Sequence, residues 1–235
     1  MKRSKQLLGA VSTIALIAFS ASPALAGGST AGSSITNNVS VSFDVGGVTQ
    51  TAVTASNTFT VDRKIDVLVD FAGTAATSVA PGAQNQVLAF DVTNLSNAVV
   101  DIRLAAALNA GNAANIANFE VYRDTNGDRS LSAAELAAGP ITYLDEVAAD
   151  GTVAVIVIAD IGLGAVNGNE FDVVLTGTAR EGGTAGTQGA AITQTAGANT
   201  AGIDTVFTDG AGTTDAARDG AYSDVGKYVV AGATM

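Results

Sequence analysis

Apolar and polar side chains alternate without interruption over residues 38–45 of this chain. The apolar members of the pattern are Val39, Val41, Phe43 and Val45, and the residues between them are Asn, Ser or Asp. A period of two is typical of a strand that buries one face and exposes the other. Gly46-Gly47 follows as a tight-turn signal, and residues 48–56 have the pattern of a return strand. We therefore predict an N-terminal hairpin.

Further segments with the composition of strands follow along the rest of the chain. The longest covers residues 59–71 and places its apolar side chains on one side. The other expected strands are residues 87–93, 99–104, 119–123, 141–144, 153–161, 170–178, 203–208 and 227–230. Because residues 153–161 are apolar on both faces, we expect that strand to be central in its sheet.

Helical patterning is scarce, and only residues 104–117 and 132–138 favour helix. Short strands rich in Val and Thr, separated by Gly and Asn turns, favour an all-β fold over a βαβ fold. We predict an antiparallel β-sandwich with Greek-key-like connections, an N-terminal hairpin and a short helix after a calcium-type loop. The expected regions are a signal peptide at 1–26, the hairpin at 27–57 and the β-sandwich domain at 58–235.

The first 26 residues predict export. A positive segment (Lys2, Arg3, Lys5) precedes an apolar run at 7–19, and Ala24-Leu25-Ala26 forms a small-x-small cleavage site. The apolar run is short for a bilayer span, and no charged flank follows it. We expect a removed secretory signal, a secreted or cell-surface location, and no membrane span after signal removal. A retained membrane anchor is the weaker alternative.

Charge and missing residue types narrow the possible functions. The chain has 11 basic and 22 acidic residues, and without the signal eight basic residues stand against the 22, a net charge of −14. Phosphate backbones repel such a chain, so we expect no nucleic-acid partner. The absence of His and Cys removes imidazole and thiol chemistry. We therefore expect no catalytic residues and no enzyme activity.

Residues 124–135, DTNGDRSLSAAE, have the ligand spacing of an EF-hand calcium loop. Oxygen-bearing side chains at alternate positions can converge on one hard cation. The predicted Ca²⁺ ligands are Asp124, Asn126, Asp128, Ser130 and Glu135. Arg129 stands where the pattern has Gly, so we expect the loop to close differently or more weakly. The alternative is an acidic turn that binds no metal.

A second acidic segment lies near the C-terminus and contains Asp204, Asp209, Asp215, Asp219 and Asp224. Because the spacing of these residues matches no fixed ligand pattern, we expect a solvated loop, with calcium binding as the minority alternative.

Two other patterns argue against enzymatic sites. Residues 162–168 have the spacing GxGxxxG, and a strand is expected after them, so no helix N-terminus is available for a dinucleotide. Asp145 and Glu146 are adjacent, and a regular strand turns neighbours to opposite faces, so they are not expected to act as a glycosidase pair.

Five segments together resemble the conserved-repeat β-sandwich domain of bacterial surface proteins. They are NNVSVSFDVGGVTQ, SNTFTVDRKIDVLV, VLAFDVTNLSNAVVDIRL, VYRDTNGDRSLSAAE and VAVIVIADI, within residues 34–178. The resemblance implies an extracellular location and a structural role without enzymatic activity. Because that domain commonly occurs in tandem, the single copy here favours a small subunit that acts in numbers.

The leading hypothesis is a secreted, calcium-binding structural subunit that self-associates into a homopolymer, as an extracellular filament or surface layer. The hairpin precedes the main body and is the candidate for exchange, because it can extend the sheet of the next subunit. Its alternative role is to complete the sandwich of its own chain. The second hypothesis is a monomeric cell-surface adhesin or matrix-binding module, which predicts a patch of exposed aromatic or apolar residues.

Overall fold

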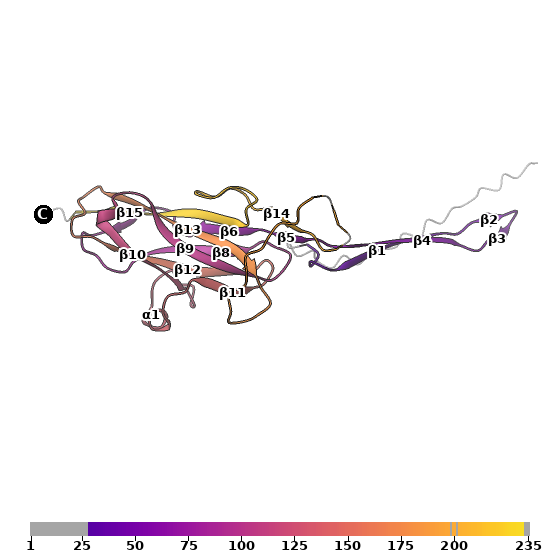
Figure 1. Cartoon of the computed structure of the whole chain (residues 1–235), viewed down its shortest axis with the longest axis horizontal. Helices are drawn as coiled ribbons and strands as arrows, with labels where there is room; N and C mark the ends of the chain where they lie inside the picture. The colour runs from indigo at the N-terminus through magenta and orange to yellow at the C-terminus, as the bar shows by residue number, and fades with distance from the viewer. Residues whose placement is uncertain (1–27, 198, 201, 233–235) are drawn as a thin grey trace, which may run out of the picture.

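The computed structural model describes residues 28–197, 199–200 and 202–232. The predicted signal peptide at 1–26 lies outside the described residues. Strands dominate the described part, which forms an elongated body from which one hairpin projects along the long axis (Figure 1). Within these residues, no helix has the length and hydropathy needed to cross a membrane.

Two sheets pack face to face in the body. The first has the strand order β10-β12-β8-β6, and the second has the order β11-β9-β13-β15-β7. The strands of the first sheet are β6 (Val67–Phe71), β8 (Gln86–Asn94), β10 (Ile116–Arg123) and β12 (Thr152–Ile161). Those of the second are β7 (Thr77–Val79), β9 (Val100–Ala110), β11 (Tyr143–Val147), β13 (Glu170–Glu181) and β15 (Ala221–Val230).

The connections confirm the predicted antiparallel β-sandwich. From β6 to β13, each successive strand lies in the opposite sheet, which is the crossing pattern of Greek-key sandwiches. All neighbours within the two sheets are antiparallel except β7, which runs parallel to β15. β12 is central, as its apolar sequence predicts, because it pairs with both β10 and β8.

The core of the body is closed by its own strands. Alternate residues of β12, including Val155 and Val157, face the space between the sheets, as do Phe171 and Leu175 of β13. Fully burying a side chain of this kind contributes roughly 1.5–3 kcal/mol to the free energy of folding. Among the described residues, the core cluster begins at Ile65 and includes no residue of the hairpin. The hairpin therefore does not complete the sandwich of its own chain.

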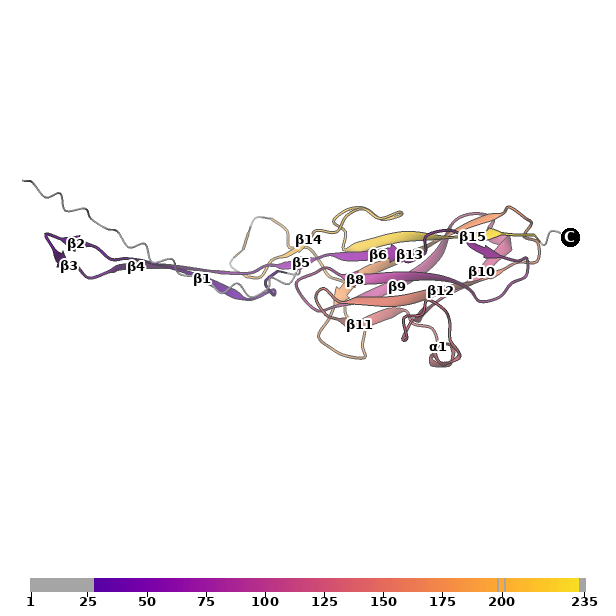
Figure 2. The same cartoon turned by 180° about the vertical axis from the view of Figure 1, so that it is seen from behind.

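The projecting hairpin has the predicted architecture. β1 (Ser34–Val41) pairs with β4 (Val53–Thr60), and β2 (Asp44–Val45) pairs with β3 (Val48–Thr49) at the tip. Gly46 and Gly47 form the turn with φ of 60° and 84°, values that glycine adopts at no steric cost. Both views show the ribbon pointing away from the body (Figures 1 and 2).

Several expected elements have different limits in the structure. Residues 104–117, expected to be helical, belong largely to β9, which ends at Ala110, and only η1 (Ala113–Asn115) is a short 3-10 turn. The prediction was wrong because the helix propensity of an Ala-rich segment yields to pairing with β13, which covers residues 104–110. The strand expected at 59–71 divides into the end of β4, β5 (Arg63–Ile65) and β6, and β5 pairs with β14 (Thr205–Phe207). The short helix is present as α1 (Ala133–Ala138).

Candidate functional sites

The hairpin presents two faces of different chemistry. Directly paired residues of an antiparallel ladder lie on the same face. One face is apolar except for the pair Asn37–Asn57, and its other pairs are Ile35–Phe59, Val39–Ala55 and Val41–Val53. The opposite face carries only hydroxyl and amide side chains, in the pairs Ser34–Thr60, Thr36–Thr58, Asn38–Ser56 and Ser40–Thr54. The ribbon is therefore amphipathic.

The described part of the chain leaves most of the apolar face uncovered, and only Ile35, near the base, is half-buried. Seven large hydrophobic side chains of the hairpin are between 44% and 64% exposed: Val39, Val41, Phe43, Val45, Val48, Val53 and Phe59. A contiguous exposed apolar surface of this kind is typical of an interaction site.

Both edges of the ribbon are also open. Within the described residues, no third strand pairs with β1 or β4. Natural edge strands are commonly protected by Lys or Pro, but residues 33–60 contain no Pro, no basic residue and one acidic residue, Asp44. The hairpin can therefore form backbone hydrogen bonds with another chain as well as apolar contacts.

The base of the hairpin is held by partly buried polar contacts. The side chain of Asn97 accepts a hydrogen bond from the Lys64 N–H (2.8 Å) and donates to the carbonyl oxygens of Ser29 (3.0 Å) and Asp62 (2.9 Å). The Arg63 guanidinium donates two hydrogen bonds to Glu181, of 2.5 and 2.9 Å. Bidentate pairs of this kind fix geometry as well as charge. These contacts fix the direction in which the ribbon leaves the body.

The predicted calcium loop lies between β10 and α1 and contains all five predicted ligands. Asp124 is buried, and its carboxylate accepts the N–H groups of Gly127 (2.6 Å) and Arg129 (3.0 Å). The Asn126 side chain accepts the N–H of Asp128, and the Asp128 carboxylate accepts the N–H and hydroxyl of Ser130. These bonds wrap the backbone around the acidic side chains, as a cation loop requires.

Glu135 closes the loop from the first turn of α1. Its carboxylate accepts the N–H groups of Thr125 (2.7 Å) and Ser132 (2.9 Å), and Ser132 caps the helix in return. These hydrogen bonds from the Ser132 and Thr125 backbones lower the pKa of Glu135 to about 2. Glu135 is therefore an anion at neutral pH although it is only 2% exposed.

Arg129, the departure from the calcium-loop pattern, has a specific structural role. Its φ is 63°, and its guanidinium donates to both carboxylate oxygens of Asp91 on β8, at 2.8 and 2.9 Å. The hydrogen bonds to Asp91 raise the pKa of Arg129. Nearby, Leu131 packs on a small apolar cluster of Tyr122, Ile156 and Ile158. The loop is thus fastened to the outer face of the first sheet.

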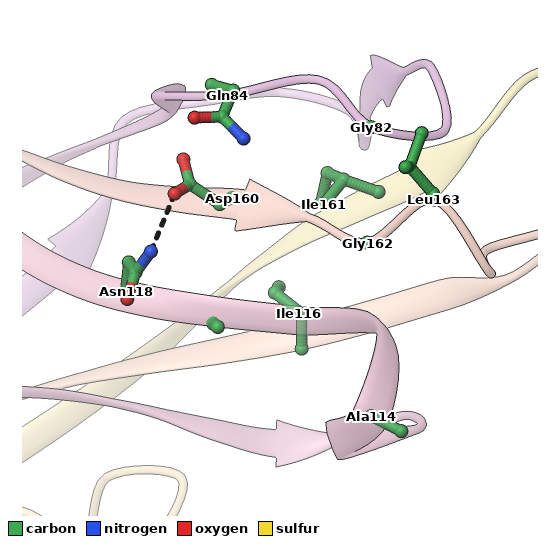
Figure 3. Close-up of a pocket in the computed structure, with 10 residues that line it drawn as sticks. Gly82, Gln84, Ala114, Ile116, Asn118, Asp160, Ile161, Gly162 and Leu163 are labelled. Atoms are coloured by element: carbon green, nitrogen blue, oxygen red, sulfur yellow. Dashed lines mark hydrogen bonds between the residues drawn. The ribbon is translucent and has the colours of Figure 1, made fainter.

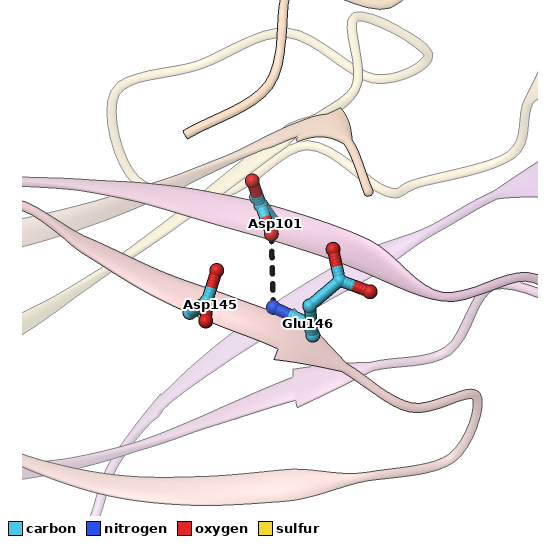
Figure 4. A group of neighbouring side chains, drawn as sticks. All are labelled: Asp101, Asp145 and Glu146. Carbon is cyan, nitrogen blue, oxygen red and sulfur yellow. Dashed lines mark hydrogen bonds between the residues drawn. The ribbon is translucent and has the colours of Figure 1, made fainter. Parts of the chain in front are cut away.

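A group of three carboxylates lies elsewhere in the body and can hold a metal ion. Asp101 of β9 and Asp145 and Glu146 of β11 each place one oxygen within 4.8 Å of the other two, the only such group among the described residues (Figure 4). The carboxylates of the predicted calcium loop are therefore not gathered as closely. Asp101 is fully buried and accepts the N–H groups of Glu146 (2.9 Å) and Gly189 (2.8 Å).

The sequence did not reveal this group because a β-bulge creates it. The register between β11 and β9 shifts between Leu144 and Val147, and Glu146 has a φ of 49°. Asp145 and Glu146 consequently both lie beside Asp101, whereas a regular strand would separate them. The expectation that these two neighbours diverge was wrong for this reason.

The C-terminal acidic residues hold turns together. Asp209 is buried and accepts the N–H groups of Asp219 and Gly220, at 3.0 Å each, and burial raises its pKa. Asp215 accepts from Gly212 and Ser223, and Asp224 accepts the N–H of Phe71. The described carboxylates of this segment thus accept hydrogen bonds from backbone N–H and hydroxyl groups.

A pocket of about 320 Å³ opens at the end of the body opposite the hairpin (Figure 3). It is lined by Ile116, Ile161 and Leu163 together with Gly82 and Gly162, and Asn118 donates a hydrogen bond to Asp160 at its wall (2.7 Å). Residues 162–168 form a loop before β13, as the sequence indicates, and no helix begins there. Residues 162–168 therefore supply no helix N-terminus for a phosphate.

Comparisons with known proteins leave the resemblance to the conserved-repeat domain as a prediction. No family model matches the chain. No curated protein matches it in sequence.

Proposed function

We propose that this protein is an extracellular structural subunit that assembles with copies of itself into a filament or surface layer. The observation that carries the proposal is the amphipathic hairpin, whose apolar face is mostly uncovered in the described part of the chain. Leaving this face in water costs roughly 25 cal/mol for each Å² that association would bury. Burial against another copy is the simplest way to recover that free energy.

The proposal includes calcium as the metal and no catalysis. Two sets of oxygen ligands support a hard cation in the body: the loop at 124–135 and the group of Asp101, Asp145 and Glu146. Carboxylate and backbone oxygens without His or Cys are the donor set that calcium prefers. Calcium would stabilise the body, and the hairpin would make one of the contacts between copies.

The test compares two substitutions at adjacent positions of β1. Val41→Asp places a charge on the apolar face, whereas Ser40→Asp places the same charge on the polar face, and both positions are exposed. We expect the wild type and Ser40→Asp to form filaments or lattices by electron microscopy, and Val41→Asp to give dispersed particles. Size-exclusion chromatography should show Val41→Asp as a smaller folded species. Dispersed monomeric particles in the wild type would support the adhesin hypothesis instead.

A further inference from the structure

Exposed hydrophobic side chains gather at one end of the molecule. Of the thirteen large hydrophobic residues that are exposed in the described part of the chain, seven lie on the hairpin. Three more lie at the adjoining end of the body: Val99 beside the start of β9, Ile203 next to Gly32, and Val206 in β14. The opposite end contributes only Leu163 and Val166, and α1 contributes Leu136.

In the described part of the body, the six exposed large hydrophobic side chains are divided among three places, so they form no apolar surface as long as the hairpin. From Ser34 to Val45 the ribbon spans about 40 Å at about 3.3 Å per residue. The pocket at the opposite end holds about 320 Å³, so it has room for the tip of a hairpin at most. The core between the sheets is already filled, with Phe90, Phe171 and Tyr228 fully buried, so it has no space for an inserted strand. The surface that best matches the hairpin is the same face of another hairpin.

Resting on the proposed function, we infer that two copies associate by packing the apolar faces of their hairpins against each other in antiparallel orientation. Val39, Val41, Val53 and Phe59 of each copy form the contact, together with the half-buried Ile35 and the pair Asn37–Asn57 of the same face. Two sheets pack at a separation of about 10 Å when apolar side chains fill the space between them. The hydroxyl and amide face of each ribbon stays in water.

Charge determines the orientation. Outside residues 33–60, the chain without its predicted signal has eight basic and 21 acidic residues, a net charge of −13, whereas the hairpin carries Asp44 alone. A parallel arrangement would place two such bodies side by side, where they repel each other. An antiparallel arrangement places the bodies at opposite ends and overlaps only the nearly uncharged ribbons.

The apolar face alone gives the contact a modest area, in the range of a weak association. A face about 40 Å long and about 10 Å wide covers roughly 400 Å² per copy, about half of the 800 Å² that a stable interface buries on each partner. Beside this face, at the base, Phe59, Asn199, Thr200 and Gly202 line a groove of about 240 Å³. In this arrangement the tip of each hairpin, with Val45 and Val48, reaches the base of its partner near Ile203.

A contact with two-fold symmetry closes on itself. Growth of a filament therefore requires a second contact elsewhere on the body, and the two parts of the assembly can be tested separately.

The absence of native cysteine makes thiol cross-linking a clean test. Val39 lies near the middle of the ribbon, so its two copies face each other in the antiparallel pair, whereas Ser40 points to the opposite face. With a short bis-maleimide, we expect Val39→Cys to give a covalent dimer and Ser40→Cys at least about ten-fold less. A mixture of Val45→Cys and Ile203→Cys proteins should form a mixed dimer, and Val45→Cys alone should not.

Three outcomes overturn the inference. The first is equal cross-linking of Val39→Cys and Ser40→Cys. The second is cross-linking of Val45→Cys to itself, which would indicate parallel ribbons. The third is cross-linking of Val45→Cys to Leu163→Cys, which would indicate a head-to-tail contact. Electron microscopy of the wild type separates this inference from the proposed function. Selective Val39→Cys dimers without filaments would support the inference and contradict the proposed function, and a wild type that is monomeric at all concentrations would contradict both.

Discussion

Strands with the same alternating pattern bury their apolar side chains in the body but expose them in the hairpin. Leu88, Phe90 and Val92 of β8 alternate with half-buried residues and are at most 1% exposed. Val39 and Val41 of β1 alternate in the same way and are more than half exposed. Alternation in the sequence therefore indicates which face of a strand is apolar, and the topology decides whether the chain itself covers that face.

The body and the hairpin are also held in shape by different interactions. The body is held by two sheets and a common core, whereas an isolated two-stranded ribbon is marginally stable in water. The ribbon is shaped by its glycine turn and by the polar contacts at its base. The body is thus stable on its own contacts, and the hairpin is completed by a partner in the assembly that we propose.

Removing one phenylalanine from each region gives the largest contrast. Phe171 is fully buried and Phe43 is 44% exposed. We expect Phe171→Ala to lower the free energy of unfolding by about 3–5 kcal/mol, because it leaves a cavity in the core. Phe43→Ala should change the value for the monomer by less than about 0.5 kcal/mol. Urea denaturation at low protein concentration measures both, and equal losses would show that the hairpin is packed in the monomer.

Calcium binding should change the free energy of unfolding of the body by less than the Phe171→Ala substitution does. At a free concentration a hundred times the dissociation constant, binding to the folded form alone adds about 2.7 kcal/mol to the free energy of unfolding. We expect the melting temperature to rise with calcium and to fall with a chelator.

Substitutions can then locate the calcium site. Asp124→Ala and Glu135→Gln should abolish the response if the loop at 124–135 binds the ion, and Asp145→Ala serves as the control. Loss of the response in Asp145→Ala alone would move the site to the group around Asp101. A full response in all three variants would contradict both sites.

The smallest predicted effect concerns Arg129. Arg129→Ala and Arg129→Gly both remove the ion pair with Asp91, which is partly exposed and worth at most about 1 kcal/mol. Only glycine also relieves the left-handed backbone, which costs other residues about 1 kcal/mol. We therefore expect Arg129→Gly to be about 1 kcal/mol more stable than Arg129→Ala by chemical denaturation. Equal stabilities would show that the positive φ carries no strain.

Local signals were sufficient to predict much of the fold. The alternation around Val39 and the Gly46-Gly47 turn predicted the hairpin, and the doubly apolar run at 153–161 predicted a central strand. Local propensity failed at 104–117, where alanines favour helix but pairing with β13 imposes an extended backbone on residues 104–110.

One candidate metal site could be predicted from a local sequence motif, and the other could not. The loop at 124–135 is contiguous, so its ligand spacing is visible in the sequence, and whether it binds calcium is still a prediction. Asp101 joins Asp145 and Glu146 only through strand pairing and a bulge, which no local pattern encodes. The uncovered face of the hairpin could not be predicted either, because it depends on where the ribbon leaves the body.

A small change of angle at the base of the hairpin produces a large displacement of its tip. For a ribbon about 40 Å long, a tilt of about 10° at the joint displaces the tip by about 7 Å, more than the roughly 4.8 Å between neighbouring strands. A small loosening at Asn97 or in the Arg63–Glu181 pair would therefore shift the tip by more than one strand position. The accuracy with which the tip meets a partner is therefore set about 40 Å away, by the polar contacts at the base.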